Sequence, residues 1–188
     1  IFTADSYGDG LSGTISRYNE KEKKIERLKK YPVENFQLGR IYRLTTLLLR
    51  MLPVEHEYKT MGLAPYYNGP QKNEVKKIFE EMQVVDGIDF KFNKKIKNIY
   101  DYLEENLEQF RFDHIAAGLQ AFTEDLLVDW ISNSLNEFSG NSVVFSGGIS
   151  MNIKANHKIS QMSNISKFFV SGAGADLSLA IGACYNEI

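Results

Sequence analysis

Near its C-terminal end the chain reads Ser146-Gly147-Gly148-Ile149-Ser150-Met151-Asn152-Ile153-Lys154-Ala155-Asn156. The apolar segment Val143-Val144-Phe145 directly before it predicts a buried strand, and the residues after it predict a helix. A strand that ends in Gly-Gly and leads into a helix can present backbone N–H groups to an anion, because glycine lets a phosphate approach the main chain closely. The pattern therefore favours a nucleotide or phosphate-ester site. A Gly-Gly turn is also a common connection between a strand and a helix, so this simpler interpretation stays open.

The overall composition is that of a globular domain. The 188 residues are 43% hydrophobic and 12% aromatic, which is enough to build a core. The 22 basic and 24 acidic residues leave a net charge of −2, which gives no support for a nucleic-acid or membrane-surface partner. The single cysteine, Cys184, excludes an internal disulfide and favours a reducing, cytoplasmic location. Its surroundings, rich in alanine and glycine, predict a buried structural thiol.

The order of predicted elements indicates an α/β fold with a mixed central sheet flanked by helices. The first three strands follow one another closely and predict an antiparallel meander. The last two strands are each followed by a helix, over 154–162 and 176–185. The predicted strands cover residues 1–4, 14–18, 23–28, 143–145 and 167–170.

The middle of the chain is predicted to be helical. Apolar residues recur at helical spacing over 38–52 and again over 99–107. Asn73 and Asp113 are the predicted N-caps of two further helices, and the helix that starts at Asp113 is the longest, reaching about Phe138.

Three predicted loops share one character: each follows a strand, is rich in glycine or serine, and carries a carboxylate or an amide. Because ligands of α/β sheets bind outside the carboxyl ends of strands, we expect these loops to converge on one cleft. Its carboxylates would supply oxygen ligands for a metal, and its glycines and amide would supply donors for a phosphate. The carboxylates are Asp5, Asp9 and Asp176, and the donors are Gly147, Gly148 and Asn152.

Each candidate also has a purely structural interpretation. Asp9-Gly10 is a common hairpin-turn pair, Asp176 is placed to cap the last helix, and Asn152 can bond the backbone of its own helix. A G-x-G-x-x-G spacing beginning at Gly8 precedes a predicted strand rather than a helix, so it does not indicate a dinucleotide fold. The histidines lack metal-binding spacing and are expected at surface or boundary positions. They are His56, His114 and His157.

Four motifs, in order along the chain, together resemble the nodulation-type and antibiotic-tailoring O-carbamoyltransferases. Residues 57–66, Glu-Tyr-Lys-Thr-Met-Gly-Leu-Ala-Pro-Tyr, look like a hallmark of that family. Residues 147–156 resemble its second signature, usually Gly-Gly-Val-Ala-Leu-Asn. Asp176 with residues 179–183 resembles the third, and residues 5–10 are similar to its Asp-Gly-x-Gly-Asp turn.

The resemblance implies an actin-like ATPase fold, shared with hexokinase and of the ribonuclease H-like type, and kinship with the tRNA threonylcarbamoyl transferases. It implies that residues 1–188 are the second lobe of a carbamoyl-transfer domain. In such enzymes a carbamoyl group from carbamoyl phosphate is activated with ATP as carbamoyl adenylate and passed to a hydroxyl of a small molecule. The implied partners are therefore carbamoyl phosphate and a hydroxyl acceptor, with no nucleic acid or membrane, and a homodimer is compatible with them.

The resemblance also implies roles for the candidate residues. Asp5 and Gly8, with the adjacent Asp9, match a phosphate-side or ribose-side turn. Gly147, Gly148 and Asn152 match the nucleotide-contacting loop. Asp176 matches an aspartate that binds iron or another divalent metal together with two histidines. Glu57 and Lys59 either orient the substrate or are solvated helix charges.

The sequence departs from the family pattern in several places. It contains no His-x-x-x-His pair, so we expect the two metal-binding histidines upstream of residue 1. We likewise expect the activating domain downstream of residue 188, and little turnover from this fragment alone. Ser178 stands where glycine is usual, and Gly172 stands where proline is frequent. Two other functions stay open: a small-molecule kinase of the same fold superfamily, and a non-catalytic nucleotide-binding module.

Overall fold

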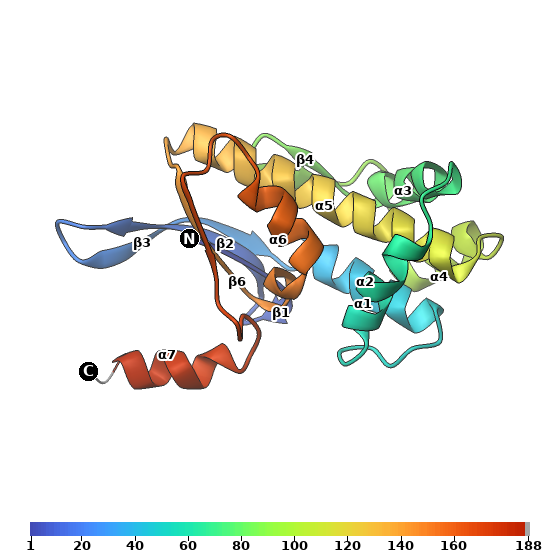
Figure 1. Cartoon of the computed structure of the whole chain (residues 1–188), viewed down its shortest axis with the longest axis horizontal. Helices are drawn as coiled ribbons and strands as arrows, with labels where there is room; N and C mark the ends of the chain where they lie inside the picture. The colour runs from blue at the N-terminus through green and yellow to red at the C-terminus, as the bar shows by residue number, and fades with distance from the viewer. Residues whose placement is uncertain (187–188) are drawn as a thin grey trace. The chain divides into compact units, whose positions relative to one another are not determined.

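A computed structural model describes residues 1–186 (Figure 1). The chain forms two compact units. The first, here called the sheet unit, comprises residues 1–39 and 139–188. The second, here called the helical unit, comprises residues 40–138. Among residues 1–186, no helix combines the length and the apolar character needed to cross a bilayer.

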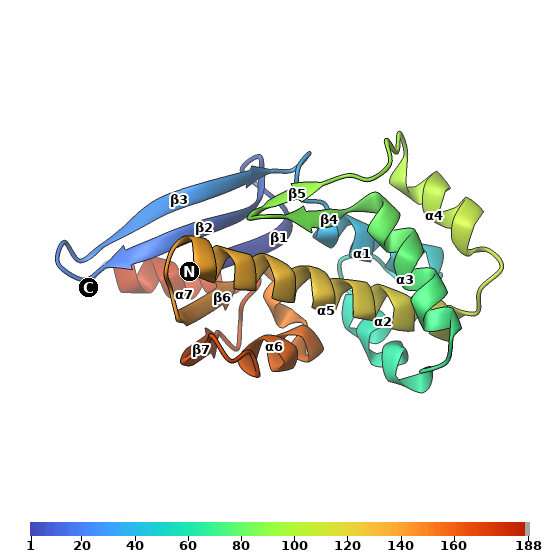
Figure 2. The same cartoon turned by 90° about the horizontal axis from the view of Figure 1, so that it is seen from above.

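The sheet unit is built on a five-stranded mixed sheet in the order β3-β2-β1-β6-β7. The neighbouring strands β1, β2 and β3 are antiparallel, which confirms the predicted meander, whereas β1 with β6 and β6 with β7 are parallel (Figure 2). The arrangement confirms the predicted mixed α/β class and is compatible with a lobe of the actin-like, ribonuclease H-like type. The strands are β1 (Phe2–Gly8), β2 (Leu11–Asn19), β3 (Lys24–Pro32), β6 (Ser142–Ser146) and β7 (Lys167–Val170).

Strand register places buried apolar side chains from three neighbouring strands on the same face of this sheet. Phe2 lies opposite Ile15 on one neighbouring strand and opposite Phe145 on the other, and all three side chains are buried. Side chains that lie opposite one another in a sheet share a face, so these residues form one apolar layer. On the alternate face Val144 lies opposite Phe169, and both are exposed.

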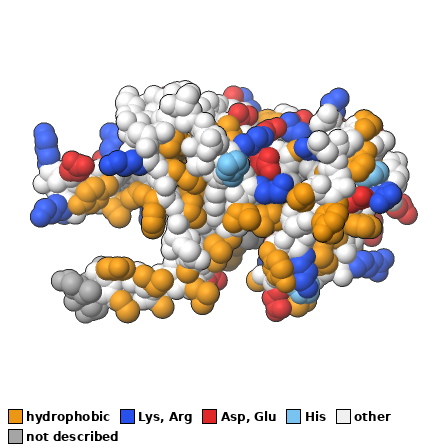
Figure 3. All heavy atoms as spheres, viewed as in Figure 1, with side chains coloured by type: hydrophobic (Ala, Val, Ile, Leu, Met, Phe, Trp, Pro, Cys, Tyr) orange, Lys and Arg blue, Asp and Glu red, His pale blue; other side chains and the backbone are white. Residues whose placement is uncertain are grey.

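Both predicted helices of the sheet unit are present, with bounds that differ by one or two residues from those predicted. After β6 the chain forms a short 3₁₀ helix, η2 (Gly148–Met151), and only then α6 (Ile153–Ser160). The last helix, α7 (Ser178–Asn186), starts two residues beyond Asp176. Exposed apolar side chains lie along α7 (Figure 3), and Cys184 is also exposed, so the prediction of a buried thiol was wrong.

The helical unit contains the predicted helices and one hairpin that the sequence analysis missed. The hairpin pairs Val84 with Lys91 and Asp86 with Asp89, with Gly87 at a φ of 62° in its turn. The first helix, predicted to reach residue 52, ends at Leu48. The elements are α1 (Leu38–Leu48), α2 (Glu57–Leu63), η1 (Ala64–Tyr66), α3 (Gln71–Met82), β4 (Val84–Asp86), β5 (Asp89–Lys91), α4 (Ile99–Leu107) and α5 (Phe112–Glu137).

Both predicted N-caps of this unit were wrong. Pro70 is the N-cap of α3, and Asn73 is the third residue of that helix. Arg111 is the N-cap of α5, and Asp113 is the second helical residue. Proline favours early helix positions because it has no N–H to satisfy, and Pro70 takes the start of α3 three residues before Asn73.

Close packing of α3 on α5 forms the centre of the helical unit (Figure 2). Phe79 of α3 stacks on Phe122 of α5 with ring centroids 5.7 Å apart. One turn earlier on α5, a Cβ on Gly118 would clash with the side chain of Val75. The two helices therefore approach closely where Gly118 provides the space.

Candidate functional site

The carboxyl ends of the three parallel strands meet at one edge of the sheet. The Gly147 N–H after β6 donates a hydrogen bond of 2.7 Å to the carbonyl oxygen of Gly174, in the loop after β7. The Ser146 hydroxyl donates to the same oxygen at 3.3 Å. The loops after β6 and β7 therefore meet, as is usual for parallel strands, whereas the cleft expected between all three loops stays a prediction.

Gly147 is required by its backbone and by its contact with β1. Its φ is 95°, which side chains disfavour, and a Cβ there would clash with the carbonyl group of Ala4. The first glycine of the pair therefore lets β6 turn directly against β1.

Gly148 faces the carboxylate of Asp5. A Cβ on Gly148 would stand 3.0 Å from Asp5 Oδ1, so only the absence of a side chain leaves space between them. Asp5 is half-buried, and its Oδ1 accepts the Ser6 N–H at 2.6 Å. The carboxylate is thus held at the strand edge, beside open glycine backbone.

A β-bulge positions Asp5. The pairing of β1 with β2 shifts between Ala4 and Gly8, and the Ser12 hydroxyl donates to the carbonyl oxygen of Ser6 across the irregular stretch. A Cβ on Gly39 would clash with the backbone of Ser6, so the chain at residue 39, still within the sheet unit, lies directly against the bulge. Bulges redirect side chains and are frequent beside functional sites.

Gly8 and Asp9 belong to the tight hairpin that joins β1 to β2. The expected turn over 5–10 is confined to residues 9 and 10, because β1 extends to Gly8. Asp9 and Gly10 have φ values of 52° and 77°, the type I′ pattern of a two-residue hairpin. The structure thus realises the hairpin-turn interpretation of Asp9, which is exposed.

Asn152 caps α6. Its Oδ1 accepts the Ala155 N–H at 3.0 Å, and only 9% of the residue is exposed. The side-chain oxygen of Asn152 therefore bonds the backbone of its own helix, as the purely structural interpretation expected. The neighbouring Ser150 is fully buried, and its Oγ has no hydrogen-bond partner among residues 1–186. A Cβ on Gly174 would clash with this hydroxyl, so the loop after β7 packs directly over it.

Asp176 does not by itself fit a metal centre. It is exposed, and its backbone carbonyl accepts the Leu179 N–H at 3.0 Å. Among residues 1–186, no group of three or more histidine, cysteine, aspartate or glutamate side chains could hold a metal ion. A single exposed carboxylate is too few ligands for iron.

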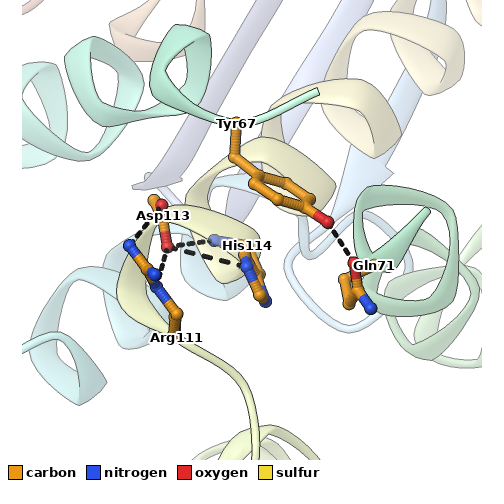
Figure 4. A network of polar contacts seen from close by, with 5 residues as sticks. All are labelled: Tyr67, Gln71, Arg111, Asp113 and His114. Atoms are coloured by element: carbon orange, nitrogen blue, oxygen red, sulfur yellow. Dashed lines mark hydrogen bonds and ion pairs between the residues drawn. The ribbon is translucent and has the colours of Figure 1, made fainter. Parts of the chain in front are cut away.

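A separate polar network in the helical unit anchors the start of α5 (Figure 4). The Arg111 guanidinium donates two hydrogen bonds of 3.1 Å to the buried Asp113 carboxylate. Asp113 Oδ1 also accepts the His114 N–H, and the His114 ring packs on Tyr67 with centroids 4.0 Å apart. Tyr67 donates to Gln71. These groups satisfy one another, and Asp113 orders the first turn of α5 although it is not the cap.

The family model described as carbamoyltransferase N-terminus matches residues 1–185. The chain belongs to this family. Two relatives of the chain, both from Methanocaldococcus jannaschii, each match 97% of it. Uncharacterized protein MJ1058 is 24% identical over 197 residues, and Uncharacterized protein MJ1051 is 26% identical over 191 residues.

These matches cover 32% of MJ1058 and 36% of MJ1051. The chain thus spans about a third of the length of the curated relatives it matches. Membership of the family associates the chain with carbamoyl transfer.

Proposed function

We propose that the sheet unit binds the nucleotide end of carbamoyl adenylate in an O-carbamoyltransferase of the nodulation or antibiotic-tailoring type. One observation carries the proposal: the Asp5 carboxylate faces Gly148 across a space that a single Cβ would fill. The family association points to a carbamoyl group as the group transferred. The glycine-lined strand edge offers a surface on which a nucleotide can lie against the backbone.

In this proposal the reaction forms one carbon–oxygen bond and breaks another. The acceptor hydroxyl oxygen attacks the carbamoyl carbon, adenosine monophosphate leaves with the bridging oxygen, and the hydroxyl proton passes to a base or to solvent. The product is a carbamate ester. The chain's contribution is to hold the adenylate in place for this attack, because fixed geometry removes much of the entropic barrier.

Asp5 is assigned to a hydroxyl of the ribose. An ionised carboxylate only accepts hydrogen bonds and repels a phosphate. Among residues 1–186, Asp5 forms no ion pair that would offset this repulsion. Because the Gly147 N–H already donates to the Gly174 carbonyl oxygen, the phosphate is placed at the Gly148 backbone N–H, and the hydroxyl-bearing ribose toward Asp5.

Asp176 is proposed as one ligand of a metal whose remaining ligands, two histidines, come from outside this sequence. The same proposal places this chain within a longer protein that also carries a domain acting on carbamoyl phosphate with ATP. The reading frame that contains the chain tests both points. A frame with neither a His-x-x-x-His pair upstream nor a further domain downstream contradicts the O-carbamoyltransferase proposal.

The nucleotide site is tested by equilibrium binding of adenosine monophosphate to the Gly148→Ala variant. We expect affinity to fall at least about tenfold, because the added methyl group occupies the space beside Asp5. The matched control is Gly62→Ala in α2, where a Cβ meets nothing within 4 Å. Equal affinity of Gly148→Ala and the unchanged protein would refute the site, provided that both unfold at the same temperature.

A further inference from the structure

The helical unit has a pocket of about 850 Å³ beside the segment that joins α1 to α2. Its apolar wall includes Leu47 and Met51, and Tyr100 and Glu104 of α4 also line it. The volume is within the range of small-molecule sites, which combine an apolar wall with a few polar groups. The basic lining residues are Arg50, His56 and Lys59.

The backbone of this segment is held in an unfavourable conformation. Val54 has a φ of 75°, which a β-branched side chain disfavours. The φ of 60° at Arg50 belongs to the C-terminal cap of α1, in which the Met51 N–H donates to the Thr46 carbonyl oxygen. The Val54 N–H donates to a Glu57 carboxylate oxygen at 2.7 Å, which fixes the strained turn. The Glu57 side chain thus stabilises the turn, whereas Lys59 lines the pocket. Strain of this kind is concentrated at ligand sites, where the surrounding structure maintains it.

Two hydrogen-bond donors face each other inside the pocket. The Leu52 N–H donates to His56 Nδ1 at 3.1 Å, so a neutral His56 carries its proton on Nε2. Lys59 Nζ lies 2.9 Å from that Nε2. A lysine ammonium has only donors, so these two groups lack an acceptor between them. An oxygen carrying negative charge is the group that would satisfy both.

The charge of the lining favours the same ligand. Two permanent cations, Arg50 and Lys59, are set against one carboxylate, Glu104. In the part of the chain that the structure describes, neither cation forms an ion pair. The Lys59 ammonium also lies 5.8 Å from the centre of the Tyr58 ring, a weaker contact that leaves its donors available.

We propose that this pocket binds a small molecule through an oxyanion, the phosphate or carboxylate group of that molecule. Its oxygens accept from Lys59, Arg50 and His56 Nε2–H, while the apolar body lies against Leu47 and Met51. All the residues that line this pocket belong to the helical unit, and its ligand is independent of the function proposed above. The two sites are therefore tested separately.

The test titrates inorganic phosphate, and separately acetate, into the full-length protein at constant ionic strength. The readout is the NMR signal of the His56 imidazole, assigned by its loss in His56→Gln. We expect a saturable shift with at least one anion. The dissociation constant should rise about tenfold in Lys59→Gln and in Arg50→Asn, because each loses a charge-assisted hydrogen bond. Asparagine is chosen at position 50 because it tolerates positive φ.

The matched control is Lys77→Gln, which removes the same charge from an exposed position on α3 outside the pocket. Its dissociation constant should stay within twofold of that of the unchanged protein. Saturation by phosphate identifies a phosphate ester as the ligand class, and saturation by acetate alone identifies a carboxylate. No saturable shift with either anion, or equal weakening in Lys77→Gln and Lys59→Gln, would overturn the proposal.

Discussion

The Asp5 carboxylate and the Gly148 backbone face each other with only the space of a missing side chain between them: a Cβ on Gly148 would stand 3.0 Å from Asp5 Oδ1. Asp5 comes from the bulged part of β1, and Gly148 from the turn that follows β6. Two segments that are remote in the sequence thus build one strand edge.

Replacing Asp5 by asparagine should weaken nucleotide binding about tenfold, because a neutral amide is a poorer hydrogen-bond acceptor for a hydroxyl than a carboxylate. Isothermal titration with adenosine monophosphate measures this. Asp9→Asn is the matched control, since Asp9 is in the exposed hairpin turn and asparagine tolerates its φ of 52°. Unchanged affinity in Asp5→Asn, or equal losses in both variants, would contradict the assignment of Asp5 to a ribose hydroxyl.

Gly147→Ala should lower the free energy of unfolding by ~3 kcal/mol, because the methyl group adds backbone strain and a clash with Ala4. Urea denaturation followed by circular dichroism measures this difference. At Gly172 a Cβ meets nothing within 4 Å, so Gly172→Ala should leave stability within about 0.5 kcal/mol. A stable Gly147→Ala protein would show that the turn after β6 differs from the one described.

Substitutions of Asn152 separate its capping part from a nucleotide contact. Asn152→Ala should cost about 1 kcal/mol of stability, because the bond from the Ala155 N–H is lost. Asn152→Asp keeps a capping oxygen, so stability should hold, while the new negative charge should weaken nucleotide binding. Thermal unfolding and adenosine monophosphate titration give the two readouts. Unchanged affinity in Asn152→Asp would leave Asn152 as a cap only.

Tyr102 should contribute a loss of stability at alkaline pH. Burial, together with the hydrogen bond to Glu81 and its negative charge, raises the pKa of Tyr102 above its ordinary value. The neutral phenol is thus favoured in the folded state. Its stabilisation is complete below about pH 10, where an unfolded tyrosine ionises, and is lost as the pH rises through the higher folded-state pKa.

Replacing Tyr102 by phenylalanine should therefore flatten the fall in the free energy of unfolding above about pH 10. Urea denaturation at pH values from 8 to about 11 measures this slope. Tyr58→Phe is the control, because the Tyr58 side chain is well exposed. An unchanged slope in Tyr102→Phe would assign the alkaline loss to other groups.

Sequence reasoning located the strand edge because its signals are local. The Gly-Gly pair follows a β-branched strand, and the rule that parallel strands end together brings Asp5, Gly147 and Gly174 to one edge without further information. The same rule cannot show which atoms are already in use. The Asn152 amide oxygen caps α6, and only the hydrogen bond to Ala155 reveals this.

The pocket of the helical unit was beyond sequence reasoning for a physical reason. Its wall joins the segment after α1 to α4, some fifty residues later, and no short-range pattern encodes that approach. The hairpin did have a local signal, since glycine at the first position of a two-residue loop, here Gly87-Ile88, is typical of a tight turn. Its strands have only three residues each, too few to show alternation.

The carbonyl oxygen of Gly174 accepts hydrogen bonds from both the Gly147 N–H and the Ser146 hydroxyl. This shared acceptor has a consequence for how the two loops can evolve. A substitution that shifts the backbone of the loop after β7 moves this acceptor away from both donors at once and so also disturbs the turn after β6. Substitutions in the two loops should therefore be epistatic, and compensating changes should arise in pairs.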